Sequence, residues 1–205
     1  MFETQLLFVG RCVYNFVGWT EDREDTGMTL KIMTIIPALL LSSVAFGQSS
    51  PQHQQDAQAA HADIVNGAGA KIGTATLVQT DGGVRIDLDV TQLPPGTHAV
   101  HVHSVGKCEG PDFKSAGPHF NPTGKKHGKD NPDGPHAGDL PNFEAGADGH
   151  ATASITDANV TLGPGANSLF QPGGTAIVVH QGPDDYKTDP AGNSGGRIAC
   201  GVVQR

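Results

Sequence analysis

The clearest pattern along the chain is an alternation of apolar and polar side chains that begins near residue 62. In residues 84–91 every second side chain is apolar, with Val84, Ile86, Leu88 and Val90 set between Arg85, Asp87, Asp89 and Thr91. A period of two is typical of a strand with one buried face. The turn "DGG" at 81–83 separates this run from "IGTATLVQT" at 72–80, and a turn between two such patterns predicts a β-hairpin.

Short apolar runs with strand character recur downstream, and none has a convincing helical period. They span residues 98–105, 151–162, 174–182 and 197–203. Glycine (28 residues) and proline (14 residues) are frequent, which favours a turn-rich all-β domain. We therefore expect an antiparallel β-sandwich or barrel. Residues 104–150 form a long stretch rich in glycine, proline, aspartate and lysine, and a loop of this length is usually functional or disordered.

Residues 28–47 are interpreted as a secretory signal peptide. A lysine near Met28 precedes the apolar run Ile32–Leu41, and small residues lead to a cleavage site after Gly47. The apolar run is too short to span a bilayer, so no stable membrane anchor is expected.

The segments on either side of this signal differ in character. Residues 1–27 carry a charge cluster and are interpreted as an upstream extension, with translation starting at Met28 or Met33; an unusually long signal peptide is the alternative. Residues 48–62 are polar and predict a flexible tail. The folded domain is expected over residues 63–205.

The charge and cysteine content indicate which kinds of partner and which cellular compartment suit this chain. The formal net charge of −8 argues against a nucleic-acid partner. Removal of the leader takes away Cys12 and leaves Cys108 and Cys200, and an even number of cysteines in an exported protein suggests a disulfide. Two buried free thiols are the alternative.

Histidine is the unusual residue of this chain, with ten against two tyrosines. His101 and His103 are two residues apart, so they share one strand face while Val100 and Val102 occupy the other. Two imidazoles on one face can chelate a metal ion, for which histidine is the commonest side-chain ligand. The spacing also occurs by chance. His180, at the end of another strand, needs a partner to count as a ligand.

The long loop adds three histidines and a carboxylate, namely His119, His127, His136 and Asp139. Three imidazoles and one carboxylate form a closed tetrahedral set that suits structural zinc. Because these donors come from an otherwise structureless segment, the metal would supply part of its folding energy. The alternative is that the loop histidines are simply solvated, which leaves their regular spacing unexplained.

Four motifs together resemble copper/zinc superoxide dismutase of the bacterial secreted type. They are "HAVHVH", "AGPHFNP", "NPDGPHAGDLPN" and "GNSGGRIACGVV", and the resemblance covers about residues 65–204. It implies a Greek-key antiparallel β-sandwich or barrel of about eight strands with long metal-binding loops.

The resemblance also implies a role for each candidate residue. The implied copper ligands are His101, His103, His119 and His180. The implied zinc ligands are His119, His127, His136 and Asp139, with the ring of His119 bridging the two metals. The other implied roles are a carboxylate that hydrogen-bonds His101 and His127 (Asp184), a residue that attracts and holds the anion (Arg197), and a disulfide (Cys108 and Cys200).

The implied activity is the disproportionation of superoxide to O₂ and H₂O₂ by copper that cycles between Cu(II) and Cu(I). His119 and Arg197 are the implied catalytic residues, and Lys107 and Lys114 are candidates for attracting the anion. The enzyme would be periplasmic or secreted and would act on superoxide outside the cytoplasm. A homodimer is left open.

Two other function classes compete with this one. A dismutase-like domain that only binds copper or zinc would be favoured by loss of a copper ligand or of the arginine, and both His180 and Arg197 are present. A zinc hydrolase is weaker still, because a closed set of four protein ligands leaves no open position for water.

Overall fold

Strand β3 (Gly83–Val90) shows how the alternating pattern becomes structure. Val84, Ile86 and Leu88 are at most 3% exposed. In the neighbouring strand β2 (Lys71–Thr80), Leu77 lies opposite Ile86, so apolar side chains of both strands meet on one inner face. Replacing Ile86 by alanine would leave a cavity there, at a cost of about 2–5 kcal/mol.

The computed structural model describes residues 58–205. The upstream extension, the signal peptide and the first ten residues of the expected tail lie outside this range. Within it, no helix is both long and apolar enough to cross a membrane.

The described residues form nine strands and one short 3-10 helix, η1 (Lys114–Ala116). Besides β2 and β3, the strands are β1 (Ala59–Asn66), β4 (Gly96–His98), β5 (Val100–His103), β6 (Phe143–Ala145), β7 (Ala151–Asp157), β8 (Ala176–His180) and β9 (Arg197–Val202).

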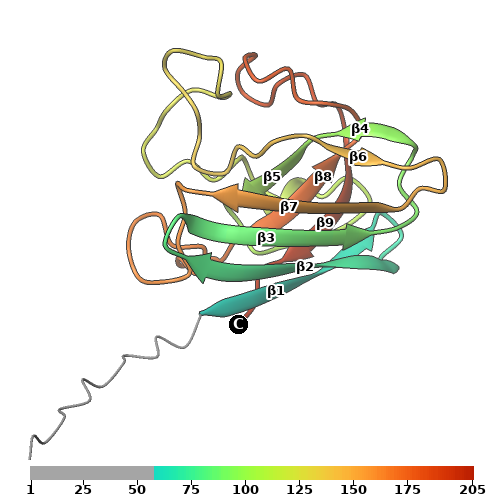
Figure 1. The fold of residues 1–205 in the computed structure, drawn as a ribbon, viewed down its shortest axis with the longest axis horizontal. Coiled ribbons are helices and arrows are strands. Elements are labelled where there is room, and N and C mark those ends of the chain that lie inside the picture. Colours follow the sequence, from blue (N-terminus) through green and yellow to red (C-terminus); the bar gives the residue numbers. More distant parts are fainter. Residues whose placement is uncertain (1–57) are drawn as a thin grey trace, which may run out of the picture. The chain divides into compact units, whose positions relative to one another are not determined.

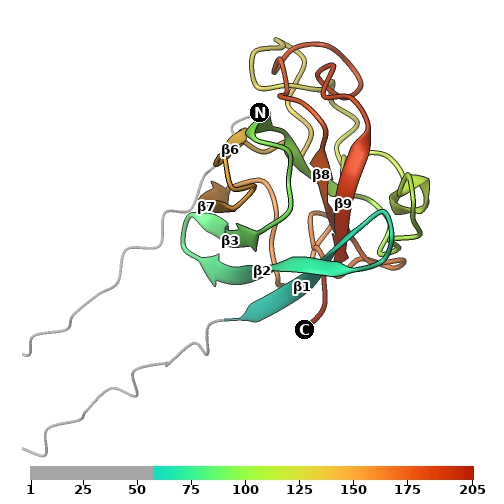
Figure 2. The ribbon, with the colours of Figure 1, turned by 90° about the vertical axis from the view of Figure 1, so that its right-hand side faces the viewer.

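Seven strands form one antiparallel sheet in the order β5-β8-β9-β1-β2-β3-β7, and β4 pairs with β6. Because β6 packs against β7 and only Ala99 separates β4 from β5, the curled sheet returns to its first edge (Figures 1 and 2). The chain runs from β3 to β4, and β6 and β7 later fill the space between them, which is a Greek-key connection. The expected all-β Greek-key barrel is confirmed.

The strands differ from the sequence expectation at several places. β4 and β5 divide the expected strand over 98–105, and β6 lies within the stretch that was expected to be a loop. β1 begins at Ala59, inside the segment expected to be a tail, because Ala60, Ala62 and Ile64 are buried and the strand pairs with β2. Because two of these buried residues are alanines, whose side chains are small, the alternation of apolar and polar residues is weak in this part of the sequence. The expected strand over 151–162 ends at Asp157, since the residues beyond it turn away from β3.

A disulfide anchors the long loop to the outside of the barrel. Cys108 is bonded to Cys200 of β9, with their Cα atoms 5.6 Å apart. Phe113 of the same loop packs against Ala176 and Val178 of β8 in a second apolar cluster, whereas Ile177 and Val179 enter the main core. The two clusters therefore lie on opposite faces of β8.

Candidate metal centre

His101 and His103 lie on the outer face of β5, because their cross-strand partners are Val178 and Ala176 of the second apolar cluster. Val102, between them, belongs to the main core. Both histidines are nevertheless 0% exposed. The loop that contains His119 and Asp139 runs alongside β5 and closes this face through isolated bridges to the two histidines.

Four histidines bring one ring nitrogen each to within 4.8 Å of one another; they are His101, His103, His119 and His180, here called the copper-side quartet. Hydrogen bonds show which nitrogen is available in each ring. His101 Nε2 is 2.9 Å from Asp184 Oδ2, and His103 Nδ1 donates to the Gly117 carbonyl at 2.8 Å. The buried atoms His101 Nδ1 and His119 Nε2 have no partner at all.

His180 completes the argument for a cation. Its Nδ1 contacts Ser194 Oγ at 3.1 Å, and its Nε2 lies 3.4 Å from Nε2 of His103. His103 carries its hydrogen on Nδ1, which faces a carbonyl, so its Nε2 presents a lone pair. The Gly195 carbonyl, which can only accept, faces His180 Nδ1 at 3.4 Å, so His180 carries its hydrogen on Nδ1 and also presents a lone pair at Nε2. Two lone pairs that face each other in a buried place repel unless a cation lies between them. The residues therefore fit an ion with imidazole ligands, as copper and zinc prefer.

A second group of donors surrounds one carboxylate oxygen; its members are His119, His127, His136 and Asp139, here called the zinc-side quartet. Asp139 Oδ1 lies 2.9, 3.0 and 3.2 Å from the Nδ1 atoms of the three rings. Its Oδ2 accepts the backbone N–H groups of Gly128 and His136 at 2.8 and 3.0 Å. Three nitrogens and one oxygen match a closed zinc site.

His119 is shared by the two quartets. Its Nδ1 faces Asp139, and its unpartnered Nε2 is left for the copper-side quartet. The ring centroids of His101 and His119 are 4.0 Å apart. One imidazole therefore offers a nitrogen to each group of donors.

Asp184 connects the quartets by a second route. Its Oδ2 contacts His101 Nε2 and its Oδ1 contacts His127 Nε2, both at 2.9 Å. The side chain of Asn142 donates to the Asp184 carbonyl and accepts the Asp184 N–H, both at 2.9 Å. Sequence reasoning missed Asn142, because nothing local in "DLPN" shows that it meets a distant loop.

Gly192 packs over the carboxylate of Asp184. It has φ of 62°, in the left-handed region that favours glycine. A Cβ atom at this position would collide with Asp184 Oδ1 and His127 Nε2. The close approach of loop 181–196 to the zinc-side quartet therefore requires glycine here.

Burial favours the neutral form of three rings of the copper-side quartet, namely His103, His119 and His180. It lowers the pKa of His119 to about 4 and of His180 to about 3. Burial also holds the pKa of His103 well below its ordinary value, and the nearby charges of other rings and of Arg197 lower it further. Neutral imidazole is the form that binds metal ions.

The zinc side has a different charge balance. Burial lowers the pKa of His127, but hydrogen bonds and charge from Asp139 and Asp184 outweigh this and raise it to about 9. Burial raises the pKa of both carboxyl groups, yet their hydrogen bonds to the histidines hold each well below its ordinary value. Both carboxylates are therefore ionised and offer negative charge to a cation.

Arg197, the first residue of β9, points its guanidinium at the loop after the disulfide. It donates to the carbonyls of Phe113 and Gly117 at 2.7 and 2.8 Å. Its charge contributes to the lowered pKa of both His103 and His180, which places it beside the copper-side quartet. Of the lysines expected to attract anions, Lys114 is exposed and paired with Asp112 at 2.7 Å.

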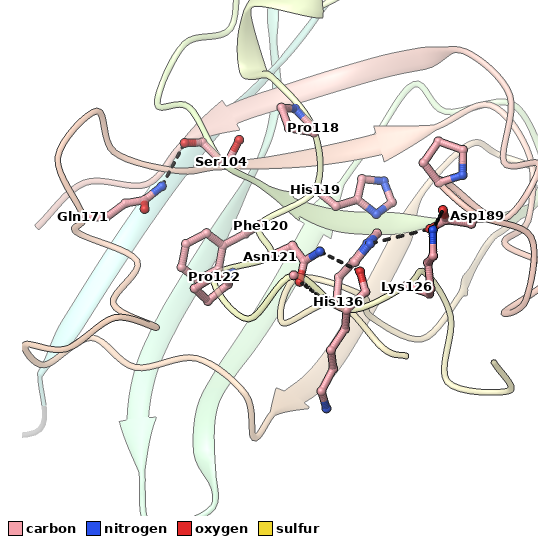
Figure 3. Close-up of a pocket in the computed structure, with 13 residues that line it drawn as sticks. Ser104, Pro118, His119, Phe120, Asn121, Pro122, Lys126, His136, Gln171 and Asp189 are labelled. Carbon is pink, nitrogen blue, oxygen red and sulfur yellow. Dashed lines mark hydrogen bonds and ion pairs between the residues drawn. The ribbon is translucent and has the colours of Figure 1, made fainter. Parts of the chain in front are cut away.

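A cavity of about 550 Å³ flanks the zinc-side quartet and reaches His119 and His136 (Figure 3). At its rim Lys126 Nζ lies 3.2 Å from Asp189 Oδ2, and Asp189 Oδ1 accepts the His127 N–H at 2.9 Å. Asp189 is a second residue that sequence reasoning missed, and it joins loop 181–196 to the loop that contains Lys126 and His127.

Comparisons with known proteins agree with this geometry. Residues 71–203 match the family model described as copper/zinc superoxide dismutase (SODC). Superoxide dismutase (Cu-Zn) 1 of Aquifex aeolicus is 58% identical over 146 residues, which covers 70% of this chain and 86% of that protein. Superoxide dismutase (Cu-Zn) 2 of the same organism is 50% identical over 169 residues, or 82% and 94%. The crystal structure of a SOD-like protein from Bacillus subtilis has a TM-score of 0.68 at 40% identity, and the match covers 69% of this chain and 96% of that chain.

Proposed function

The chain belongs to the copper/zinc superoxide dismutase family, and from this premise we propose a residue-level account of its activity. Membership makes it a superoxide dismutase with copper and zinc as cofactors. The assignment of residues to each metal, the shared histidine and the site of action in the cell are the content of the proposal.

Copper is assigned to the copper-side quartet and zinc to the zinc-side quartet. The single observation that carries the copper assignment is the pair of facing Nε2 atoms of His103 and His180, 3.4 Å apart. The zinc assignment rests on the three Nδ1 atoms gathered around Asp139 Oδ1. His119 is then the bridging ligand, and Asp184 orients His101 and His127. Such carboxylates fix the tautomer and orientation of ligating rings.

The overall reaction converts two superoxide anions and two protons into one O₂ and one H₂O₂. Copper held by the copper-side quartet would supply the one-electron redox chemistry that both halves of the reaction need, which zinc cannot supply. Arg197 holds the anion beside the copper-side quartet, and its two carbonyl contacts fix the guanidinium in place. A fixed positive charge favours the anionic substrate over neutral O₂ and H₂O₂.

His119 is proposed to deliver a proton as well. Its Nε2 is buried and hydrogen-bonds to no protein group, so a proton there has no competing protein acceptor. Its Nδ1 stays engaged on the zinc side at Asp139. Whenever Nε2 is not bound to copper, the ring would hold a proton there and would give it to the second superoxide as that anion is reduced.

We place the enzyme outside the cytoplasm, in the periplasm or secreted, as the signal sequence predicts. The Cys108–Cys200 disulfide supports this location, because such bonds persist in oxidising compartments. A homodimer is the assembly to test by analytical ultracentrifugation of the metal-loaded protein.

The test is superoxide disproportionation by the purified, metal-quantified chain, compared with the variant His180→Ala. We expect turnover that requires one copper per chain and that falls more than about 100-fold in the variant, while zinc stays bound. Bound zinc with no turnover after copper is supplied would instead favour a scaffold that only binds metal.

A further inference from the structure

Ser194 is a buried polar residue to which neither the sequence nor the proposed function gives a role. It lies on loop 181–196, three residues before Arg197, and is 1% exposed. Its Oγ is 3.1 Å from His180 Nδ1 and 2.8 Å from the carbonyl oxygen of Ala191. A hydroxyl group therefore touches a proposed copper ligand directly, away from solvent.

The acceptors around this pair determine where the hydrogens lie. The Ala191 carbonyl can only accept, so the Ser194 hydroxyl donates to it and turns a lone pair toward the ring. The carbonyl of Gly195, 3.4 Å from the same ring nitrogen, can also only accept. Nδ1 of His180 therefore carries the hydrogen, and its Nε2, which faces His103, carries none.

Backbone hydrogen bonds hold Ser194 in position, and none of them involves its hydroxyl group. The Ser194 N–H also points to the Ala191 carbonyl, at 3.2 Å, and the Ser194 carbonyl accepts the Gly182 N–H at 2.9 Å. Removal of the hydroxyl would leave the turn with its backbone bonds and the Ala191 carbonyl with a donor. The contact that would be lost is the one to His180.

We propose that Ser194 is a positioning residue for copper, whose hydroxyl fixes the ring orientation and tautomer of His180. The inference rests on the proposed function, because it takes His180 as a copper ligand. Partners of a ligating histidine's second nitrogen typically change metal affinity or activity by about 10–100-fold. Without the hydroxyl, His180 Nδ1 keeps only the Gly195 carbonyl at 3.4 Å, beyond the usual range of about 2.7–3.2 Å.

The test is Ser194→Ala in the full chain loaded with zinc. Copper affinity is measured by competition with a colorimetric chelator, and the Cu(II) environment by electron paramagnetic resonance. We expect copper to bind about tenfold more weakly, with a changed Cu(II) hyperfine coupling. Zinc affinity and the thermal unfolding of the metal-free protein stay as in the wild type.

Thr175→Val is the matched control. Thr175 is 0% exposed, and its hydroxyl donates to the Leu169 carbonyl at 2.8 Å rather than to a member of either quartet. This variant should unfold at a lower temperature yet keep the wild-type copper affinity and spectrum.

Three results would overturn the inference. Ser194→Ala with wild-type copper affinity and spectrum would show that the hydroxyl does not position the ring. Equal changes in Thr175→Val would show a general loss of stability. Wild-type protein that binds zinc but no copper, or whose copper is unaffected by His180→Ala, would refute the proposed function together with the inference.

Discussion

The two quartets are built from different kinds of structure. His101 and His103 stand on β5 and His180 ends β8, so strand pairing fixes three of the four copper-side donors. The zinc-side donors all come from residues 119–139, which contain no strand. The strand-borne donors are held by regular strand pairing, whereas the loop-borne donors are held by isolated bridges to β5 and by hydrogen bonds to side chains such as Asp139 and Asp189. The comparison teaches that the same imidazole donors can be positioned by paired strands or by a loop, and we expect the loop to depend more on its metal ion.

Selective removal of zinc should reveal the difference between the loop-borne and the strand-borne donors most clearly. The loop 119–139 loses the cation that offsets the charge of Asp139, so the free energy of unfolding should fall by at least about 5 kcal/mol. Amide hydrogen exchange followed by mass spectrometry should show lost protection in the loop and retained protection in β5 and β8. Selective copper removal is the control and should change exchange much less. Equal loss of protection in loop and strands would contradict the distinction.

Removal of the disulfide by Cys108→Ala with Cys200→Ala tests the copper side. The bond closes a separation of 92 residues, and in the chain-entropy model its loss costs about 4–5 kcal/mol. The loop that carries the Arg197 carbonyl partners is then less fixed, so activity should fall while zinc affinity stays unchanged. Denaturant unfolding measures the loss of stability, and zinc titration measures the zinc affinity. A drop in zinc affinity equal to the drop in activity would argue against a local effect.

Asp157 belongs to neither quartet, although the charge of Asp139 contributes to its raised pKa, and it tests whether pH sensitivity can arise from a carboxyl that is not a proposed metal ligand. Burial raises the pKa of this carboxyl to about 7, although Asn159 hydrogen bonds oppose the shift. The folded pKa lies above the unfolded value of 3.8, so stability decreases as pH rises from about 4 to 7, and the cost is complete above 7. Asp157→Asn should therefore be more stable than the wild type at pH 8, by up to about 4 kcal/mol, and nearly equal at pH 4.

Chemical unfolding of both metal-loaded proteins across this pH range gives the measurement. A stability difference that does not depend on pH would show that Asp157 does not titrate in this window. A variant that is less stable at pH 8 would show that the buried carboxylate has a partner that stabilises its charge.

Asp184→Asn should produce the smallest change and should sharpen the comparison, because Asp184 contacts one ring from each quartet. An amide of the same shape can no longer accept from both His101 Nε2 and His127 Nε2. We expect the affinities for copper and zinc each to fall by about 10–100-fold. Competition titrations for the two metals check this. If the affinity for only one of the two metals fell, Asp184 would stabilise the ligands of that metal alone.

Most of the strands and six of the seven donors of the two quartets follow from short-range features of the sequence. The period of two placed His101 and His103 on one face, and the spacing of His119, His127 and His136 before Asp139 marked the second group. Which histidine completes the copper side came from the family resemblance, because His180 has no local partner in the sequence.

The residues that hold the donors in place could not be predicted in the same way. Asn142, Asp189 and Ser194 act through contacts with positions 14 to 62 residues away in the chain. The contacts of Asn142 and Asp189 exist only once loop 181–196 has folded over residues 127–142, which no local pattern encodes. The start of β1 was missed for a different reason, because alanine is too small to give a strong hydrophobic signal.

The close packing of Gly192 has a consequence for how this sequence can vary. Most loop positions at a protein surface accept many amino acids, and loop 181–196 is largely exposed. Position 192 is different, since any side chain would meet the Asp184 carboxylate and the His127 ring. In a saturation mutagenesis library selected for activity, this residue should tolerate as little substitution as a metal ligand, although it offers no side-chain atom to any ion.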